Sequence, residues 1–251
     1  MQRVKTRIFS GAVCEQLVFN ISDRIQDIRT AKPKPRFQNE EERERHREGI
    51  SRREHIRKFN QNFGPSSYYS TLTFDNEYEV HTFGEAKQVR KKYARRLMYH
   101  FPDAKLMIYI GRGKATNRIH FHMVSEGIPE EMIKKLWGMG GVVRIEHLRE
   151  HNFYNGKDHG QDYTGLANYL FDHWTPEQGG RHYKQAGKMV KPEREPPAPA
   201  KRNYSEDRPP RPPKGYILVE SRATQYGYLY FKYVRKPEPV RRKKAGGKRP
   251  S

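Results

Sequence analysis

Arg118-Ile119-His120-Phe121-His122-Met123-Val124 is the stretch of the sequence that decides the fold. Side chains of a β-strand alternate between its two faces, so the stretch predicts a strand with an apolar face and a histidine face. The apolar side chains can pack beneath helices. The two imidazoles converge on the other face, which is the arrangement that a divalent metal needs from a rigid scaffold. By itself, the spacing also fits two surface histidines on a half-exposed strand.

The segments around this strand predict an antiparallel sheet. Residues 104–110 are apolar on both faces, which suits a central strand, and the glycines and asparagine of 111–117 fit a hairpin connection to the histidine strand. Residues 68–74 have the β-branched and aromatic content of another strand. Residues 142–145 predict a further short strand.

Three helices are predicted to cover this sheet. In residues 85–100 apolar side chains recur at helical spacing, with Lys and Arg on the remaining faces. Pro129 opens a second helix that ends near Trp137, and a third spans residues 165–174, before Thr175-Pro176. We therefore expect an α+β fold with a central antiparallel sheet flanked by helices.

The rest of the chain is predicted to extend from this core. Residues 1–61 have the composition of a basic arm followed by a charged, solvated helix, and residues 62–192 form the core. The proline-rich residues 193–214 predict an extended linker. Residues 215–235 predict a terminal β-hairpin, and residues 236–251 form a basic tail.

The charge of the chain points to nucleic acid as a partner. The 251 residues include 50 Lys and Arg against 29 Asp and Glu, a formal net charge of +21. Such an imbalance repels itself unless a polyanion neutralises it. No apolar run approaches the ~20 residues needed to span a bilayer, so no membrane partner is expected. A single cysteine, Cys14, and a start without the apolar core of a signal peptide favour the reducing cytoplasm of a bacterium.

Further motifs accompany the histidine pair, and they lie in a recognisable order. They are Phe59-Asn60-Gln61-Asn62-Phe63 with Ser70-Thr71-Leu72-Thr73-Phe74, then His120-Phe121-His122, then Leu166-Ala167-Asn168-Tyr169-Leu170. In order and spacing they resemble the first motif, the metal motif and the tyrosine helix of the HUH endonuclease superfamily. Within it, the chain is similar to rolling-circle replication-associated proteins of bacterial plasmids, phages and integrated elements. Residues 181–192 also resemble the segment that follows the family's tyrosine helix.

The resemblance implies a five-stranded antiparallel sheet, an RRM-like palm, with His120 and His122 as metal ligands on a central strand and Tyr169 on a helix beneath them. It implies a replication initiator that nicks single-stranded DNA at an origin. In that chemistry a divalent metal polarises the scissile phosphate and a tyrosine oxygen attacks it, leaving a 5′-phosphotyrosine and a free 3′-hydroxyl. Imidazole ligands favour Mn²⁺ over Mg²⁺, whereas cellular abundance favours Mg²⁺.

Two positions depart from the family pattern. Many relatives have an acidic residue on the strand before the histidine motif and a lysine three positions after the tyrosine, where this chain has Gly111 and Asp172. Tyr169, Asp172 and His173 share one helix face, so we expect Asp172 or His173 to supply the missing ligand or base. Alternatively, His173 only caps the helix before Thr175-Pro176.

Tyr163 is the rival nucleophile. Its six-residue offset places it on a different helix face from Tyr169, unlike the four-residue pair of initiators with two tyrosines. The sequence therefore predicts a site with one catalytic tyrosine, Tyr169.

The basic residues expected to contact DNA lie in a hairpin and in the tail: Arg112, Lys114, Arg118, Arg241, Arg242, Lys243 and Lys244. No Gly-x-x-x-x-Gly-Lys-Ser/Thr loop occurs, which leaves the opening of duplex DNA to a partner such as a host helicase. Two alternatives stay open. One is a tyrosine-dependent transposase of the same superfamily, and the other is a non-catalytic single-strand nucleic-acid-binding module, which Gly111 and Asp172 favour.

Overall fold

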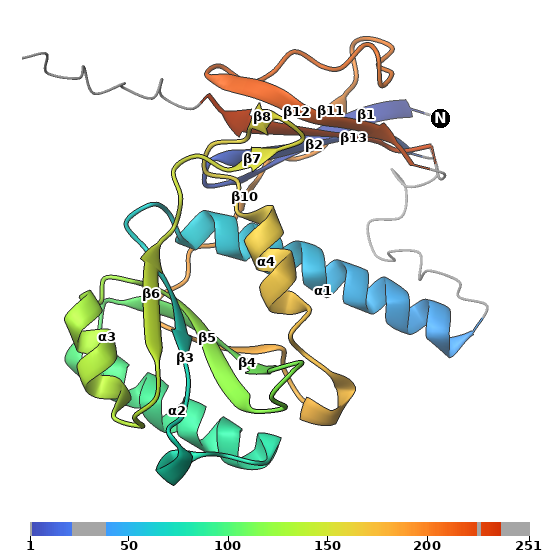
Figure 1. The fold of residues 1–251 in the computed structure, drawn as a ribbon. Coiled ribbons are helices and arrows are strands. Elements are labelled where there is room, and N and C mark those ends of the chain that lie inside the picture. Colours follow the sequence, from blue (N-terminus) through green and yellow to red (C-terminus); the bar gives the residue numbers. More distant parts are fainter. Residues whose placement is uncertain (1, 22–38, 225–226, 237–251) are drawn as a thin grey trace, which may run out of the picture.

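The computed structural model describes residues 2–21, 39–224 and 227–236. Its fold is α+β, as predicted: a lower body of helices around an antiparallel sheet lies against a second antiparallel sheet at the top of Figure 1. Of the helices in the described residues, none combines the length and the apolar character that crossing a bilayer requires.

The core sheet contains the histidine strand near its centre. Its five strands lie in the order β6-β3-β5-β4-β9 and all neighbouring pairs are antiparallel. Their bounds are β3 Tyr68–Leu72, β4 Lys105–Arg112, β5 Ile119–Glu126, β6 Val143–His147 and β9 Tyr183–Ala186. The predicted strands β3, β4, β5 and β6 are confirmed. The edge strand β9 was not predicted as a strand.

One face of the core sheet is covered by α2 (Phe83–His100) and α3 (Glu130–Trp137), as the helical periodicity predicts. The apolar face of β5 packs there, because Ile119, Phe121 and Met123 all belong to the core cluster beneath these helices. A capping box fixes the start of α2, since the backbone N–H of Glu85 donates to Thr82 and the Glu85 carboxylate accepts from the backbone of Thr82.

The opposite face is covered by α1 (Glu40–Asn62) and α4 (Thr164–Phe171). Its core includes Phe59 of α1 and Met107 and Tyr109 of β4, all fully buried. The expectation of a solvated helix is correct only for the first half of α1. The second half carries a buried stripe and packs against α4 as part of the core.

The predicted N-terminal arm is wrong, because β1 (Gln2–Ser10) and β2 (Val13–Ile21) form a hairpin. This hairpin pairs through β2 with the predicted terminal hairpin, which consists of β12 (Tyr216–Ala223) and β13 (Leu229–Arg235). The proline-rich segment is not a free linker. Its short strands β10 (Glu193–Arg194) and β11 (Ala198–Pro199) pair with β1, which completes a six-stranded accessory sheet.

Buried ion pairs join the accessory sheet to the core. Arg57 of α1 binds the Glu15 carboxylate of β2, with 2.5 Å between Nε and Oε2. Lys232 of β13 lies 2.5 Å from Asp162, just before α4, and also donates to the Thr164 hydroxyl. Both pairs are almost fully buried, so the accessory sheet is fixed against the two helices that cover the histidine face. A minor hairpin of β7 (Phe153–Tyr154) and β8 (Lys157–Asp158) precedes α4.

Candidate metal and tyrosine site

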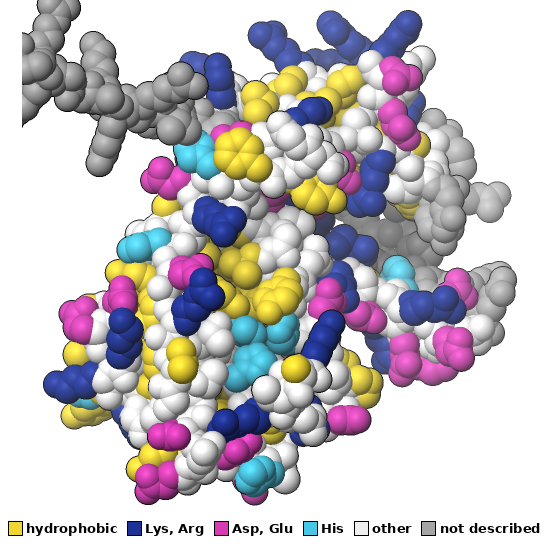
Figure 2. Space-filling view, viewed as in Figure 1, with side chains coloured by type: hydrophobic (Ala, Val, Ile, Leu, Met, Phe, Trp, Pro, Cys, Tyr) yellow, Lys and Arg dark blue, Asp and Glu magenta, His cyan; other side chains and the backbone are white. Residues whose placement is uncertain are grey.

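His120 and His122 lie next to each other on β5 and face α4. Their Nε2 atoms are 3.1 Å apart. Two nitrogens that each bind one ion at about 2.1 Å lie roughly 3 Å from each other, so this spacing suits two ligands of one metal. In Figure 2 histidine side chains gather below α4 on the visible face, beside hydrophobic ones.

His173 joins this pair from the turn that ends α4. The ligand atoms of His120, His122 and His173 all lie within 4.8 Å of one another. The Nδ1 atom of His173 lies 2.7 Å from the carbonyl oxygen of Tyr169. Because a carbonyl only accepts, Nδ1 carries the proton and Nε2 keeps its lone pair. His173 therefore caps the helix and also turns a ligand nitrogen toward the other two histidines.

Hydrogen bonds to the far ring nitrogens orient the strand pair. The Nδ1 atom of His122 is 2.8 Å from the Tyr69 hydroxyl and 3.3 Å from that of Thr71, both on β3. The Nδ1 atom of His120 is 3.4 Å from the carbonyl oxygen of Arg118. Partners of this kind hold the ring orientation of metal-binding histidines.

Gly111 of β4 provides the space in which these rings meet. It lies directly opposite His120 in the register of β4 and β5. A Cβ at this position would approach His120 Nε2 to 2.6 Å and His173 Cδ2 to 2.9 Å. The residue that departs from the family pattern is therefore the one that makes room for His173. Three converging imidazoles fit a divalent metal.

Burial keeps the strand pair uncharged at neutral pH. Burial, together with the neighbouring His173 and His120, lowers the pKa of His122 to about 3. Burial also lowers the pKa of His120. The neutral imidazole is the form that binds a metal, so the site holds its ligands ready.

Tyr169 lies beside the histidines and Tyr163 does not. The Tyr169 ring is 4.4 Å from that of His173 and 5.8 Å from that of His122, centroid to centroid, and its side chain is 51% exposed. Tyr163 is 3% exposed, and its hydroxyl donates to the carbonyl oxygen of Arg149. Burial also raises the pKa of Tyr163, which opposes its use as a nucleophile.

Asp172 turns away from the three histidines. Its carboxylate lies 2.6 Å from the guanidinium of Arg52 on α1, and it is not part of the ligand group. Of the two residues expected to supply a ligand or base, the structure brings only His173 to the cluster. Asp172 instead links the end of the tyrosine helix to α1.

The residues expected to contact DNA differ in their exposure and in the contacts that their side chains already make. Arg112 at the end of β4 and Lys114 in the connection to β5 are exposed, and the Arg112 guanidinium stacks over the Phe83 ring at 4.6 Å. Arg118 forms an ion pair with Glu79 at 3.0 Å and donates to the carbonyl oxygen of Phe74, so it is partly engaged. The tail residues 241–244 lie outside the described residues.

Sequence reasoning missed the residues that support the cluster. Tyr69 and Thr71 share the histidine face, and this follows from the period of two within the predicted strand 68–74. The register that sets Thr71 opposite His122 carries no local signal, because it depends on pairing between strands about fifty residues apart. Arg52 was read only as one charge in a helix.

Comparison with known proteins adds no relative: no family model, curated protein or solved structure matches the chain.

Proposed function

We propose that this chain is a metal-dependent nickase of single-stranded DNA, which initiates rolling-circle replication through Tyr169. The observation that carries the proposal is the convergence of three imidazoles beside one exposed tyrosine ring. The rival nucleophile, Tyr163, is buried and hydrogen-bonded. The net charge of +21 supports a polyanionic substrate.

Each residue has one task in the proposed reaction. His120, His122 and His173 hold a divalent cation, Mn²⁺ or Mg²⁺, which when bound would withdraw charge from the scissile phosphate. The Tyr169 oxygen gives its proton to solvent and forms a bond to phosphorus, while the bond from phosphorus to the 3′ oxygen breaks. The 3′ oxygen takes up a proton and leaves as a hydroxyl, and the 5′ phosphate stays on the tyrosine.

Fixed geometry is the contribution of the surrounding chain. Tyr69 and Thr71 orient His122, and the carbonyl oxygen of Tyr169 orients His173. The nucleophile and a ligand thus share one hydrogen-bonded turn. Holding the attacking oxygen in place matters, because misplacement by about 1 Å can cost ~100-fold in rate.

The biological setting belongs to the same proposal. The substrate is the single-stranded origin of the genetic element that encodes the chain, in the cytoplasm of a bacterium. The sequence contains no Walker-type phosphate loop, so a host helicase would supply the strand opening.

Adduct formation tests the proposal. Single-stranded oligonucleotides that tile the encoding element are incubated with the chain and Mn²⁺, and covalent adducts are resolved on a denaturing gel. His120→Ala, His122→Ala and His173→Ala should each lower adduct yield by more than ~100-fold, because outer partners of metal ligands alone are worth about 10- to 100-fold. Binding of the same DNA should persist, since the basic surface is unchanged.

A matched control separates loss of the ligand from loss of any histidine. His81 is exposed and lies outside the ligand group, so His81→Ala should retain full adduct yield. Undiminished adduct formation in chelator, or in all three cluster variants, would contradict the metal assignment.

A further inference from the structure

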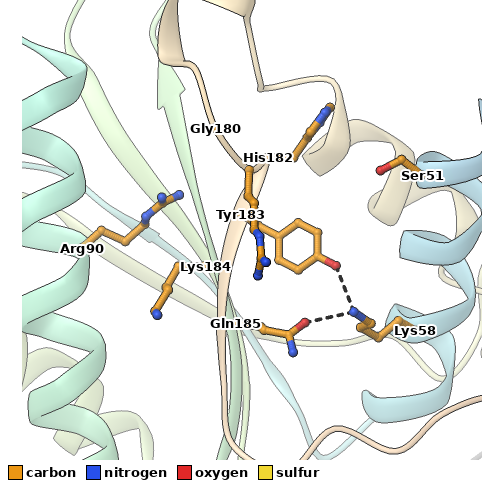
Figure 3. Close-up of a pocket in the computed structure, with 9 residues that line it drawn as sticks. Ser51, Lys58, Arg90, Gly180, His182, Tyr183, Lys184 and Gln185 are labelled. Atoms are coloured by element: carbon orange, nitrogen blue, oxygen red, sulfur yellow. Dashed lines mark hydrogen bonds between the residues drawn. The ribbon is translucent and has the colours of Figure 1, made fainter. Parts of the chain in front are cut away.

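A basic groove crosses the β9 edge of the core sheet, outside the histidine cluster. Its volume is about 600 Å³. Figure 3 shows Arg90 and Lys184 on one side of β9 and Lys58 on the other side, with Tyr183 pointing toward Lys58. None of the described residues that line the groove carries a carboxylate.

The strand register explains why cations appear on both sides of β9. Lys184 pairs with Ile108, whose side chain packs beneath α2, so Lys184 shares that face with Arg90. Tyr183 pairs with Tyr109 on the opposite face, beneath α1, where Lys58 projects. The groove therefore wraps around the sheet edge, and β9 has no strand partner on its outer side among the described residues.

Arg90 is the most unusual of these cations. It is 8% exposed, and within the described part of the chain its guanidinium makes one hydrogen bond, a long one of 3.4 Å to the carbonyl oxygen of Ile108. Burial lowers the pKa of Arg90 to about 10, and no carboxylate in the described part of the chain opposes this effect. A buried guanidinium without an anion costs free energy, and an anion entering the groove would relieve that cost.

The other groove cations are also free of carboxylate partners in the described residues. Lys58 donates to Gln185 at 3.0 Å and to the Tyr183 hydroxyl at 3.4 Å, both neutral groups. Neither Arg181 nor Lys184 forms an ion pair there. By contrast, the neighbouring Arg52 is bound to Asp172 and Glu48. The groove thus offers positive charge that the fold itself leaves uncompensated.

The groove is connected to the end of the tyrosine helix. His182, which lines it, stacks between the rings of Phe171 and Trp174, with centroid distances of 3.9 and 4.3 Å. Phe171 is the last residue of α4, and Trp174 follows the ligand His173. A strand that passes Tyr169 and follows this end of α4 would come to His182 and then to the groove.

We propose that this groove binds the phosphodiester backbone of the single strand that the chain cuts, so that consecutive phosphates contact the cations on both sides of β9. The ligand must carry repeated charges, because the cations lie on two faces of the sheet edge and the groove is larger than one phosphate. Guanidinium binds phosphate through paired N–H groups, and lysine does so as a point charge. The assignment of the strand as the one that is cut rests on the proposed nickase function.

Binding of a labelled oligothymidine about 16 nucleotides long tests the groove. The assay uses the full chain carrying Tyr169→Phe, with chelator present, so that no cleavage interferes. Fluorescence anisotropy is followed over a range of salt concentrations. Combining Arg90→Gln with Lys184→Gln should raise Kd about tenfold and lower the salt slope by about 1.4, since each lost phosphate contact removes ~0.7.

The control removes the same charge from another surface. Lys91 and Lys92 are exposed on α2 and do not line the groove, so replacing both with Gln should leave Kd within about twofold of the parent. Because Arg90 is buried, a second variant combines Lys58→Gln with Lys184→Gln, and thermal melting confirms that each variant folds. Equal losses in the groove and control variants would overturn the proposal.

Competition identifies the ligand. Unlabelled oligothymidine should displace the labelled strand from the parent chain, whereas pyrophosphate, a mononucleotide and polyglutamate at equal phosphate or carboxylate concentration should not. Displacement by pyrophosphate or mononucleotide would assign the groove to a small phosphate ligand instead, and displacement by polyglutamate would assign it to an acidic peptide.

These outcomes are separate from those of the nickase proposal. Groove-dependent binding by a chain that never forms an adduct would remove the nickase and keep the groove as a strand-binding site. If the adduct forms but strand binding is insensitive to the groove variants, the groove proposal fails and the nickase proposal stands.

Discussion

Gly111 sets the geometry of the histidine cluster at the scale of a single residue. An added methyl group would lie 2.6 Å from His120 Nε2 and 3.0 Å from its Cε1 atom. These atoms belong to side chains that can swing aside, so the fold can accommodate the change. The ligand arrangement cannot, because both His120 and His173 would be displaced.

Gly111→Ala should therefore weaken metal binding without unfolding the protein. We expect the affinity for Mn²⁺, measured by calorimetry, to fall by more than about tenfold. The melting temperature of the metal-free protein should stay within about 2 °C, because an alanine suits a strand better than a glycine does. Gly165→Ala is the control, since a Cβ there meets nothing within 4 Å. Unchanged Mn²⁺ affinity in Gly111→Ala would contradict the three-histidine site.

The sequence predicts part of this site. The period of two within a strand places His120 and His122 on one face, and the structure agrees. Helical spacing groups Tyr169, Asp172 and His173, but the helix ends at Phe171, and the chain then turns. The turn sends Asp172 to Arg52 and His173 to the cluster. Helical spacing cannot predict in which direction Asp172 and His173 point, because both residues follow the end of the helix.

The contact between α1 and α4 decides the position of the tyrosine helix at the scale of elements. His55 of α1 is 2% exposed, and its Nε2 atom lies 3.2 Å from the carbonyl oxygen of Ala167, two residues before Tyr169. Since a carbonyl only accepts, Nε2 carries the proton. The other ring nitrogen is buried without a partner in the described residues.

Acid should weaken this contact. Burial lowers the pKa of His55 from 6.5 to about 4 in the folded protein. Between these values the unfolded chain binds more protons than the folded one, so stability is complete above pH 6.5 and is lost as pH falls toward 4. From pH 7 to pH 5 the loss from His55 is about 2 kcal/mol.

Replacing His55 with glutamine measures how much stability the His55 imidazole costs in acid. His55→Gln keeps an N–H donor for Ala167 but does not titrate. Urea unfolding at the two pH values should show that the variant loses about 2 kcal/mol less than the parent. The comparison with the parent is needed because His120 and His122 also have lowered pKa values. Equal losses in both proteins would show that His55 is not buried in its neutral form.

Strand prediction succeeded where local pattern and partner lie close together. β4 and β5 are joined by a short connection whose glycines and Asn117 were visible. β1 and β2 are joined by a turn at Gly11, but their apolar stretches are short and are followed by Lys32-Pro33-Lys34-Pro35, and this mixture suggested an arm. The pairing of β2 with β13 joins segments from opposite ends of the chain, and no local pattern specifies it. β9, with four residues, is too short for a periodic signal.

At the scale of the whole molecule, the described residues end at Lys236, and the sequence after it is rich in Lys and Arg. Arg235 belongs to β13, and the backbone N–H of Lys236 donates to the carbonyl oxygen of Gly215, so the accessory sheet extends through Lys236. The cations predicted to contact DNA in the tail follow at Arg241-Arg242-Lys243-Lys244.

Truncation after Lys236 should weaken DNA binding equally for all sequences. The salt slope of binding should fall by ~0.7 for each tail cation that contacts a phosphate of a single strand. Discrimination between the origin and random DNA should survive, because contacts of Lys and Arg with phosphates carry no sequence information. Anisotropy titrations with both DNA species measure this. Retained affinity with lost discrimination would contradict the assignment of the tail.

The central claim is that Tyr169 is the nucleophile, and mapping of the covalent adduct tests it most directly. The chain is incubated with Mn²⁺ and the cleaved oligonucleotide, then digested, and the DNA-linked peptide is identified by mass spectrometry. The account predicts that this peptide contains Tyr169, that Tyr169→Phe forms no adduct, and that Tyr163→Phe still forms it, because the Tyr163 hydroxyl is buried against Arg149. An adduct on Tyr163, or one that survives Tyr169→Phe, would contradict it.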